Sequence, residues 1–335
     1  MIADIVLGAQ YGDEGKGKVT HHLLKSGKYT HCIRFNGSNN AGHTIYHEGQ
    51  KIVTHSIPSG VLYDDIRCII GPGCALNPEQ FFLELKELED AGINTNNVFI
   101  ADNCHVIMPD HLSEDGTDEV IGTTRRGNGP AYRAKYGRTG VLAREIPEFK
   151  PYLVNFYEEL HGNGQKPVIL CEGAQGFGLD IDWGDYPYVT SSHCTTGSVI
   201  LNGIPHQWVR NVWGVAKIYE TYVGKKLFQD PNEPVFERIC QVGTEFGATT
   251  GRKRQIGWLD TDLLDKSAKI NGFTHLIFNK CDVLKQIGVF KARKGAEKTL
   301  EFTQFTHFEA YLRAKYGHFE GKKRQIFFSE TPNGI

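Results

Sequence analysis

The chain has 335 residues, enough for one large domain or two ordinary ones and for a sizeable core without disulfides. A hydrophobic content of 40% and a charged content of 23% are typical of soluble globular proteins and exclude global disorder. The 37 basic and 39 acidic side chains give a net charge of −2, which excludes general nucleic-acid binding and a polybasic membrane anchor. We therefore expect small-molecule partners, because a local cluster of cations can still bind a small anion.

The amino-terminal residues 1–8 are interpreted as a buried strand rather than a signal peptide, because an aspartate stands at position 4 and no long apolar run follows. No stretch of the sequence is long enough and apolar enough to span a bilayer. The eight cysteines are scattered without a Cys-x-x-Cys pair, which indicates reduced thiols and no zinc site. These features predict a cytoplasmic protein.

Short apolar runs followed by glycine-rich turns and helical segments predict an α/β fold with a mostly parallel central sheet and flanking helices. The expected strands lie at residues 5–7, 32–35, 168–170, 276–278 and 325–328. The expected helices lie at residues 19–24, 78–91, 147–161, 261–270 and 305–316. No linker or repeat divides the chain, so residues 1–335 are interpreted as a single domain, with the lysine-rich segment 286–322 as a surface appendage.

The first glycine-rich segment, residues 8–18, has the composition of a phosphate-binding loop. It stands between an expected strand and an expected helix, so that backbone N–H groups, the helix N-terminus and Lys16 can converge on an anion. The spacing differs from that of the usual P-loop, and Gly17 stands where serine or threonine would bind magnesium. Asp13 lies inside this loop, where a carboxylate repels phosphate unless a metal ion or a proton transfer needs it. The loop therefore predicts a nucleotide site in which Asp13 is functional.

The segment 10–18 closely resembles the signature of adenylosuccinate synthetases, enzymes that join aspartate to C6 of inosine monophosphate (IMP) using GTP. Similar segments follow in the order of the family, at residues 40–44, 121–124, 129–132, 172–176, 186–192 and 247–258. The resemblance spans roughly residues 4–284, and the short chain is most similar to the compact archaeal and phage members. It implies a cytoplasmic, homodimeric carbon–nitrogen ligase of purine biosynthesis that uses GTP and Mg²⁺.

The resemblance also implies roles for the catalytic residues. Asp13 would remove the proton from N1 of the purine, so that the oxygen on C6 can attack the γ-phosphate of GTP. His43 would act as an acid toward the transferring phosphoryl group. Lys16 and Gln175 would complete the catalytic group, and Mg²⁺ would be bound by Asp13 and Gly42.

The substrate contacts follow from the same matched segments. Asn-Lys-x-Asp at residues 279–282 is the guanine-reading pattern of GTPases, in which the aspartate accepts hydrogen bonds from N1–H and the 2-amino group. The expected GTP contacts are Gly15, Lys16, Gly17, Gly42, Thr44, Asn279, Lys280 and Asp282. The expected contacts of the purine monophosphate are Asn40, Thr124, Arg138, Gln175, Thr190 and Val223, with Arg138 reaching the 5′-phosphate bound by the neighbouring subunit.

A third set of residues would bind aspartate. The segment 247–254 places hydroxyl groups and guanidinium forks between glycines, which favours a loop that closes over a dicarboxylate. The expected aspartate contacts are Thr249, Thr250, Arg252 and Arg254.

Three departures from the family pattern concern the acceptor nucleotide. Arg125 stands where the family usually has glycine, Tyr222 replaces a usual arginine, and residues 225–229 lack the Gly-Pro-Phe-Pro stretch. One alternative is therefore a phage-type enzyme that takes dGMP and gives N6-succino-2-amino-2′-deoxyadenylate. Such relatives typically lose the aspartate corresponding to Asp13, so we rank IMP first. Another alternative is a GTP-binding switch protein, which would not need the arginine-rich loop.

Overall fold

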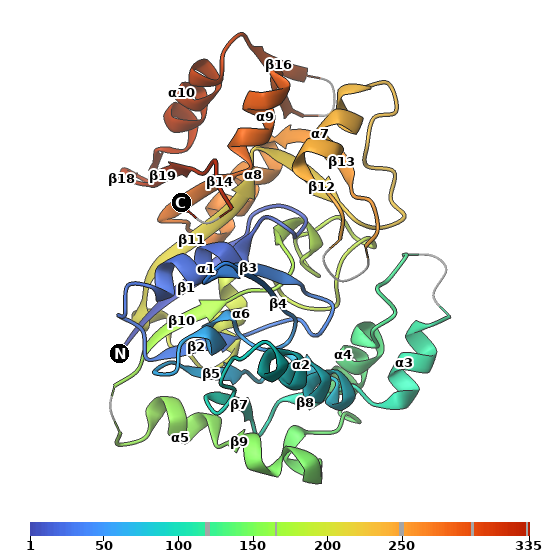
Figure 1. The fold of residues 1–335 in the computed structure, drawn as a ribbon, viewed down its shortest axis with the longest axis vertical. Coiled ribbons are helices and arrows are strands. Elements are labelled where there is room, and N and C mark those ends of the chain that lie inside the picture. The colour runs from blue at the N-terminus through green and yellow to red at the C-terminus, as the bar shows by residue number, and fades with distance from the viewer. Residues whose placement is uncertain (118–120, 165, 248–250, 296–297, 333) are drawn as a thin grey trace.

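The computed structural model describes residues 1–117, 121–164, 166–247, 251–295, 298–332 and 334–335 (Figure 1). Within these residues the main sheet has nine parallel strands in the order β19-β14-β11-β1-β10-β2-β5-β7-β9. The strands are β1 (Ile2–Gly8), β2 (His31–Arg34), β5 (Arg67–Ile70), β7 (Val98–Ala101), β9 (Leu153–Val154), β10 (Val168–Glu172), β11 (Val209–Lys217), β14 (His275–Asn279) and β19 (Gln325–Phe328). The expected α/β fold and all five expected strands are confirmed.

Helices cover the sheet, and three of them, α2, α8 and α10, begin at the predicted residue, while α1 begins three residues earlier than predicted. They are α1 (Lys16–Leu24), α2 (Pro78–Asp90), α3 (Pro109–Asp115), α4 (Asn128–Gly137), α5 (Phe156–His161), α6 (Thr196–Leu201), α7 (Val235–Gly243), α8 (Thr261–Asn271), α9 (Cys281–Ile287) and α10 (Phe305–Tyr316). The single helix expected over residues 147–161 is wrong. Residues Pro147–Tyr152 form a 3₁₀ helix that contains Pro151, and α5 begins only after Asn155, whose side chain accepts from the N–H of Glu158.

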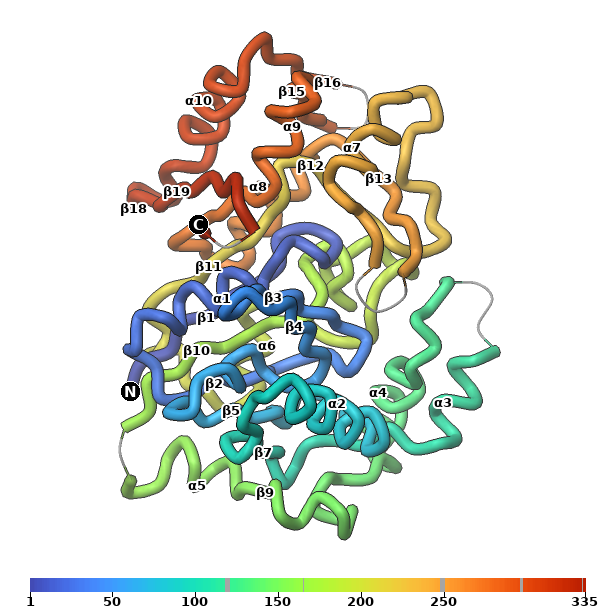
Figure 2. Tube along the Cα trace, in the orientation of Figure 1, coloured from blue at the N-terminus to red at the C-terminus, as the bar shows by residue number. Residues whose placement is uncertain are grey.

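A smaller sheet lies beyond the β14–β19 end of the main one. It is formed by β12 (Tyr219–Tyr222), β13 (Gln255–Asp260), β15 (Phe290–Lys294) and β16 (Lys298–Phe302). The segment 286–322 supplies β15, β16 and α10, and the side chains of Phe308, Leu312 and Tyr316 are buried there against the main core. Figure 2 shows this carboxy-terminal part at one end of the molecule and residues from about 80 to 160 at the other.

Three strand pairs complete the described strands. They are β3 (His43–His47) with β4 (Gln50–Thr54), β6 (Ala75–Leu76) with β8 (His105–Val106), and β17 (His318–Phe319) with β18 (Lys322–Lys323). All eight cysteines lie in described segments and are buried free thiols, as expected from their spacing. Among the described residues, no helix is long and apolar enough to cross a membrane.

Candidate active site

A cavity of about 1020 Å³ opens where β1, β10, β11 and β14 end. The carboxyl ends of parallel strands are the usual place for a ligand site in an open α/β sheet, because the following loops converge there. Among the described residues, every expected site residue except Arg138 lines this cavity. Arg138 is exposed at the carboxy-terminal end of α4, and Thr249 and Thr250 lie outside the described residues. The fold therefore gathers segments separated by more than 200 residues around one space.

The 8–18 loop is held in shape by a buried acid that the sequence reasoning missed. The Glu14 carboxylate accepts hydrogen bonds from the backbone N–H groups of Gln10 (3.1 Å) and Gly12 (2.9 Å). It also forms an ion pair with Lys16 Nζ at 2.7 Å, and Lys16 donates a second hydrogen bond to the carbonyl oxygen of Gln175. In this structure the oxygens of Glu14 and Gln175 therefore hold the Lys16 ammonium group in place at the cavity.

Gly17 stands where the usual P-loop has serine or threonine, and the structure gives a reason for the glycine. A Cβ atom added at Gly17 would lie 2.8 Å from Cβ of His43, closer than side chains pack. The lack of a side chain therefore lets the start of α1 approach β3, the strand that begins with His43. Serine or threonine at this position would push the two segments apart.

Asp13 is partly exposed and ends a chain of paired charges whose other members are mostly buried. Arg254 donates from Nε to Asp13 Oδ2 (2.7 Å) and from Nη1 to Glu245 Oε2 (2.5 Å). Glu245 also accepts from Lys217 Nζ (2.7 Å) and from the hydroxyl of Tyr219 (2.6 Å). Burial acts to raise the pKa of Glu245, but Lys217 and Arg254 together lower it to about 2. The carboxylate is therefore ionised at neutral pH and holds Arg254 beside Asp13.

His43 is enclosed by charged side chains from the main sheet. Its Nδ1 lies 2.5 Å from Glu172 Oε1, and Arg34 Nη1 lies 3.1 Å from its Nε2. Glu172 accepts further hydrogen bonds from the N–H and hydroxyl of Ser59. Burial and the Arg34 guanidinium lower the pKa of His43 to about 4, although Glu172 opposes this shift. His43 is thus a neutral imidazole at neutral pH, and it donates Nδ1–H to the carboxylate.

Within the 279–282 segment, one residue binds the 8–18 loop and another lines the cavity. Asn279 is buried and donates from Nδ2 to the carbonyl oxygen of Glu14 (2.6 Å), so it ties β14 to the 8–18 loop. Lys280 donates to the carbonyl oxygen of Gly243 (2.8 Å). Asp282 lines the cavity from the first turn of α9. Lys18 also lines the cavity, and it is a cation that the sequence reasoning missed. Burial lowers the pKa of Lys18 to about 8.

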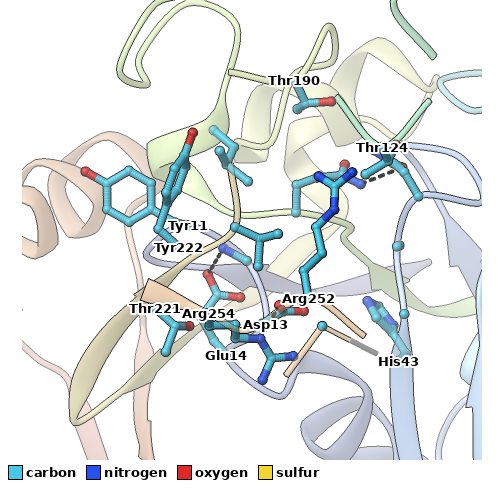
Figure 3. A pocket seen from close by; sticks show the side chains of 18 of the residues that line it. Tyr11, Asp13, Glu14, His43, Thr124, Thr190, Thr221, Tyr222, Arg252 and Arg254 are labelled. Atoms are coloured by element: carbon cyan, nitrogen blue, oxygen red, sulfur yellow. Dashed lines mark hydrogen bonds and ion pairs between the residues drawn. The ribbon is translucent and has the colours of Figure 1, made fainter. Parts of the chain in front are cut away.

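The opposite end of the cavity is formed by neutral polar side chains. Gln175 donates from Nε2 to Asn40 Oδ1 (2.9 Å), and Asn128 donates to the hydroxyl of Thr190 (3.4 Å). Figure 3 shows Thr124 and Thr190 at this end, away from Asp13, Arg254 and His43.

Aromatic rings form one wall beside the neutral end. Tyr222 stacks on Phe228 with the ring centroids 5.5 Å apart and meets Tyr11 edge-on at 5.8 Å. Tyr11 in turn donates its hydroxyl to Asp185 Oδ2 (2.7 Å). Tyr222 is the residue that replaces a usual arginine, so this wall is apolar at a position where the family pattern is charged.

The donor set in the cavity fits a magnesium ion. The Asp13 carboxylate and the backbone carbonyl of Gly42 are oxygen ligands, the kind that Mg²⁺ prefers, and both residues line the same space. Another group of potential ligands, Asp180 with Asp182 and His193, lies outside this cavity. The oxygens of Asp180 there already accept backbone N–H groups, including that of Cys194 at 2.5 Å.

Comparison with known proteins agrees with the fold and the matched segments. The family model for adenylosuccinate synthetase matches residues 5–150 and 143–327. The adenylosuccinate synthetase of Geobacillus sp. (strain WCH70) is 37% identical over 343 residues, covering 87% of this chain and 80% of the relative. That of Vibrio vulnificus (strain YJ016) is 38% identical over 352 residues, with the same coverage.

Two solved structures share the fold. The fully ligated adenylosuccinate synthetase from Plasmodium falciparum has a TM-score of 0.84 and 28% identity, covering 98% of this chain and 97% of that chain. The cyanophage S-2L succinoaminodeoxyadenylate synthetase, bound to dGMP and dATP, has a TM-score of 0.76 and 22% identity, covering 99% and 93%. These matches define a carbon–nitrogen ligase. The chain belongs to the adenylosuccinate synthetase family, whose members use GTP and Mg²⁺ to ligate aspartate to a purine nucleotide.

Proposed function

We propose that this enzyme joins L-aspartate to C6 of IMP through a 6-phosphoryl intermediate, giving adenylosuccinate, GDP and phosphate. The observation that carries this proposal is Asp13, a carboxylate in the 8–18 loop whose orientation is fixed by Arg254 within the shared cavity. The name that the bacterial relatives share, adenylosuccinate synthetase, supports IMP as the acceptor.

In the first step, Asp13 takes the proton from N1 of IMP while the oxygen on C6 attacks the γ-phosphorus of GTP and GDP leaves. Lys16 and the 8–18 loop line the cavity, and we assign Lys16 and the loop's backbone N–H groups to the phosphates. Mg²⁺, held by Asp13 and Gly42, would neutralise charge on the phosphate oxygens. Asp282 accepts from guanine, and Asn279 keeps the loop in place through its hydrogen bond to Glu14.

His43 has to change its hydrogen bonding before it can act as an acid. Its Nδ1 hydrogen is directed to Glu172, and its Nε2 faces Arg34. Donation to the phosphoryl group therefore requires a proton on Nε2 and displacement of Arg34 from that nitrogen. The negative charge of the arriving phosphate favours both changes, because it stabilises a cationic imidazole.

In the second step, the amine of aspartate attacks C6 and phosphate leaves. We assign Arg252, Thr249 and Thr250 to the substrate carboxylates. Arg254 engages Nε with Asp13 and Nη1 with Glu245, so we assign its Nη2 to the substrate. Exposed Arg138 is assigned to the 5′-phosphate of a partner subunit in a homodimer.

An acceptor panel tests this proposal. IMP, dIMP, GMP and dGMP are each supplied with aspartate and GTP, and the products are identified by mass. We expect IMP to give the highest kcat/KM, because the 2-amino group of a guanine acceptor must find both space and a hydrogen-bond acceptor in the pocket. Preference for dGMP would replace IMP as the substrate, and GTP hydrolysis without aspartate would favour a switch protein.

A further inference from the structure

The side chain of Gln255 uses its whole hydrogen-bonding capacity on one segment of backbone. Its Oε1 accepts from the N–H groups of Phe228 (2.9 Å) and Gln229 (3.1 Å). Its Nε2 donates to the carbonyl oxygens of Gly224 (3.3 Å) and Lys226 (2.8 Å). A primary amide has two lone pairs and two N–H donors, so this segment satisfies all four. The segment that follows β12 is therefore bound to the first residue of β13.

Strand β13 also makes room for the ring of Phe228. A Cβ atom added at Gly257 would lie 2.9 Å from Cε1 of Phe228, closer than side chains pack, so the glycine lets the ring lie against the strand. Gln255 and Gly257 are two positions apart on a strand and therefore face the same side. Between them, the N–H of Ile256 donates to the side chain of Gln229 (3.1 Å). These contacts hold both the backbone and the ring of the segment against β13.

Phe228 lies behind two side chains that line the main cavity. It stacks on Tyr222, and Tyr11 meets it edge-on with the ring centroids 5.1 Å apart. Tyr11 and Tyr222 line the cavity side by side, whereas Phe228 does not reach it (Figure 3). Tyr222 is also paired with Gln255 across β12 and β13, which places their side chains on the same face. The positions of both tyrosines therefore depend on where β13 holds Phe228.

The two tyrosines stand beside the end of the cavity that we assign to the acceptor nucleotide. We propose that Gln255 is a positioning residue for the acceptor, which acts by holding Phe228 behind these tyrosines. The inference rests on the proposed function, because that function assigns this end of the cavity to the purine monophosphate. It also gives a joint role to two departures from the family pattern, Tyr222 and residues 225–229, which form one unit with β13.

Gln255 directly follows Arg254, so an effect on aspartate binding is the competing explanation. Arg254 is held independently, by Asp13 at 2.7 Å and by Glu245 at 2.5 Å. Neither contact involves the side chain of Gln255. Loss of the Gln255 amide should therefore affect the acceptor much more than aspartate.

The test compares Gln255→Met with Asn97→Leu, since each replacement removes an amide and keeps about the same size. Asn97 donates to the carbonyl oxygens of Tyr63 (2.9 Å) and Ile66 (3.0 Å), and none of these three residues lines the cavity. It therefore controls for the general effect of releasing a loop. Steady-state kinetics varies each substrate in turn, after urea unfolding shows that both variants are folded. We expect Gln255→Met to raise the KM of the acceptor about tenfold, the equivalent of one hydrogen bond, with the KM of GTP and of aspartate within about twofold of the wild type. Asn97→Leu should leave all three KM values unchanged.

A second variant shows whether Gln255 acts through the ring. Phe228→Leu keeps the backbone hydrogen bonds to Gln255 but removes the ring behind the tyrosines, so it should also raise the KM of the acceptor. The double variant should raise this KM by less than the product of the two single effects, because both replacements act at one contact. If Gln255→Met does not fold, Phe228→Leu alone decides, with the same expected selectivity for the acceptor.

Three results would overturn the proposal. They are an unchanged KM of the acceptor, an equal rise for all three substrates, and a rise confined to aspartate. Fully independent effects of the two replacements would overturn it as well. Failure of the proposed function is seen separately, because the wild type would then not turn over IMP, and the variants are compared with the purine monophosphate that the acceptor panel selects.

Discussion

Glu172 is the buried acid on which the position of His43 depends. Replacing Glu172 by glutamine tests how much its charge contributes to the stability of the protein. The side chain of Glu172 is fully buried, contacts His43 Nδ1 at 2.5 Å and lies 3.8 Å from Nη2 of Arg34. Glutamine keeps the shape but removes the charge. The Arg34 guanidinium, which is only 2% exposed, would then lose its nearest counter-charge.

The expected loss of stability follows from the pKa of the carboxyl group. Burial acts to raise the pKa of Glu172, but Arg34 and His43 lower it from 4.5 to about 2. A shift of that size corresponds to about 3 kcal/mol of unfolding free energy, and breaking a buried ion pair typically costs about 3–5 kcal/mol. Because the folded-state pKa is depressed, this contribution is present above about pH 4.5 and is lost as the pH falls toward 2.

Urea unfolding at pH 7.5 measures this loss, which should be smaller at pH 3, and Glu159→Gln is the matched control. Hydrogen bonds from His31 and Arg67 also lower the pKa of Glu159 to about 2, but the Arg67 side chain is 41% exposed. Solvent screens that pair, so the control should lose about 1 kcal/mol or less. Equal losses in the two variants, or a Glu172→Gln protein as stable as the wild type, would refute the argument.

Three further predictions concern the cavity itself. Gly17→Ala should lower turnover, because the new Cβ would lie 2.8 Å from Cβ of His43 and would separate the loop from β3. Steady-state kinetics would show this loss, and an unchanged far-ultraviolet circular dichroism spectrum would show that the fold is intact. Full activity would refute the prediction. Asp13→Asn should cut kcat by roughly 10²–10⁴-fold while calorimetry still detects GTP binding, and near-normal kcat would remove the base role. Asp282→Asn should weaken GTP use and admit xanthosine triphosphate, because an acceptor becomes a donor; a donor-nucleotide panel decides this, and unchanged GTP preference would reassign Asp282.

Much of the fold could be predicted from local sequence. Strand β14 is buried along its whole length, and its centre appears in the sequence as the apolar run Leu276–Phe278. The failure at residues 147–161 has a local cause as well. Apolar spacing there is compatible with a helix, but Pro151 prevents one long helix and Asn155 starts a short one.

The sequence motifs predicted which segments form the site, but not how their side chains pair. Glycine-rich loops at strand ends indicated which segments meet, but the charge pairs between them carry no local signal. Asp13 and Arg254 are 241 positions apart, and Lys217 and Glu245 are 28 apart. Nothing in the spacing of Glu14 shows that its carboxylate folds back onto the loop. Such pairings depend on the fold, which brings the end of β11, the segment after α7 and the residue before β13 together.

The central claim is that the oxygen on C6 attacks the γ-phosphate before the amine of aspartate attacks C6. Turnover of IMP labelled with ¹⁸O on C6, followed by mass analysis of the released orthophosphate, tests it most directly. We predict one labelled oxygen in each phosphate and no phosphate release without aspartate. Unlabelled phosphate, or phosphate released at the same rate without aspartate, would contradict the account.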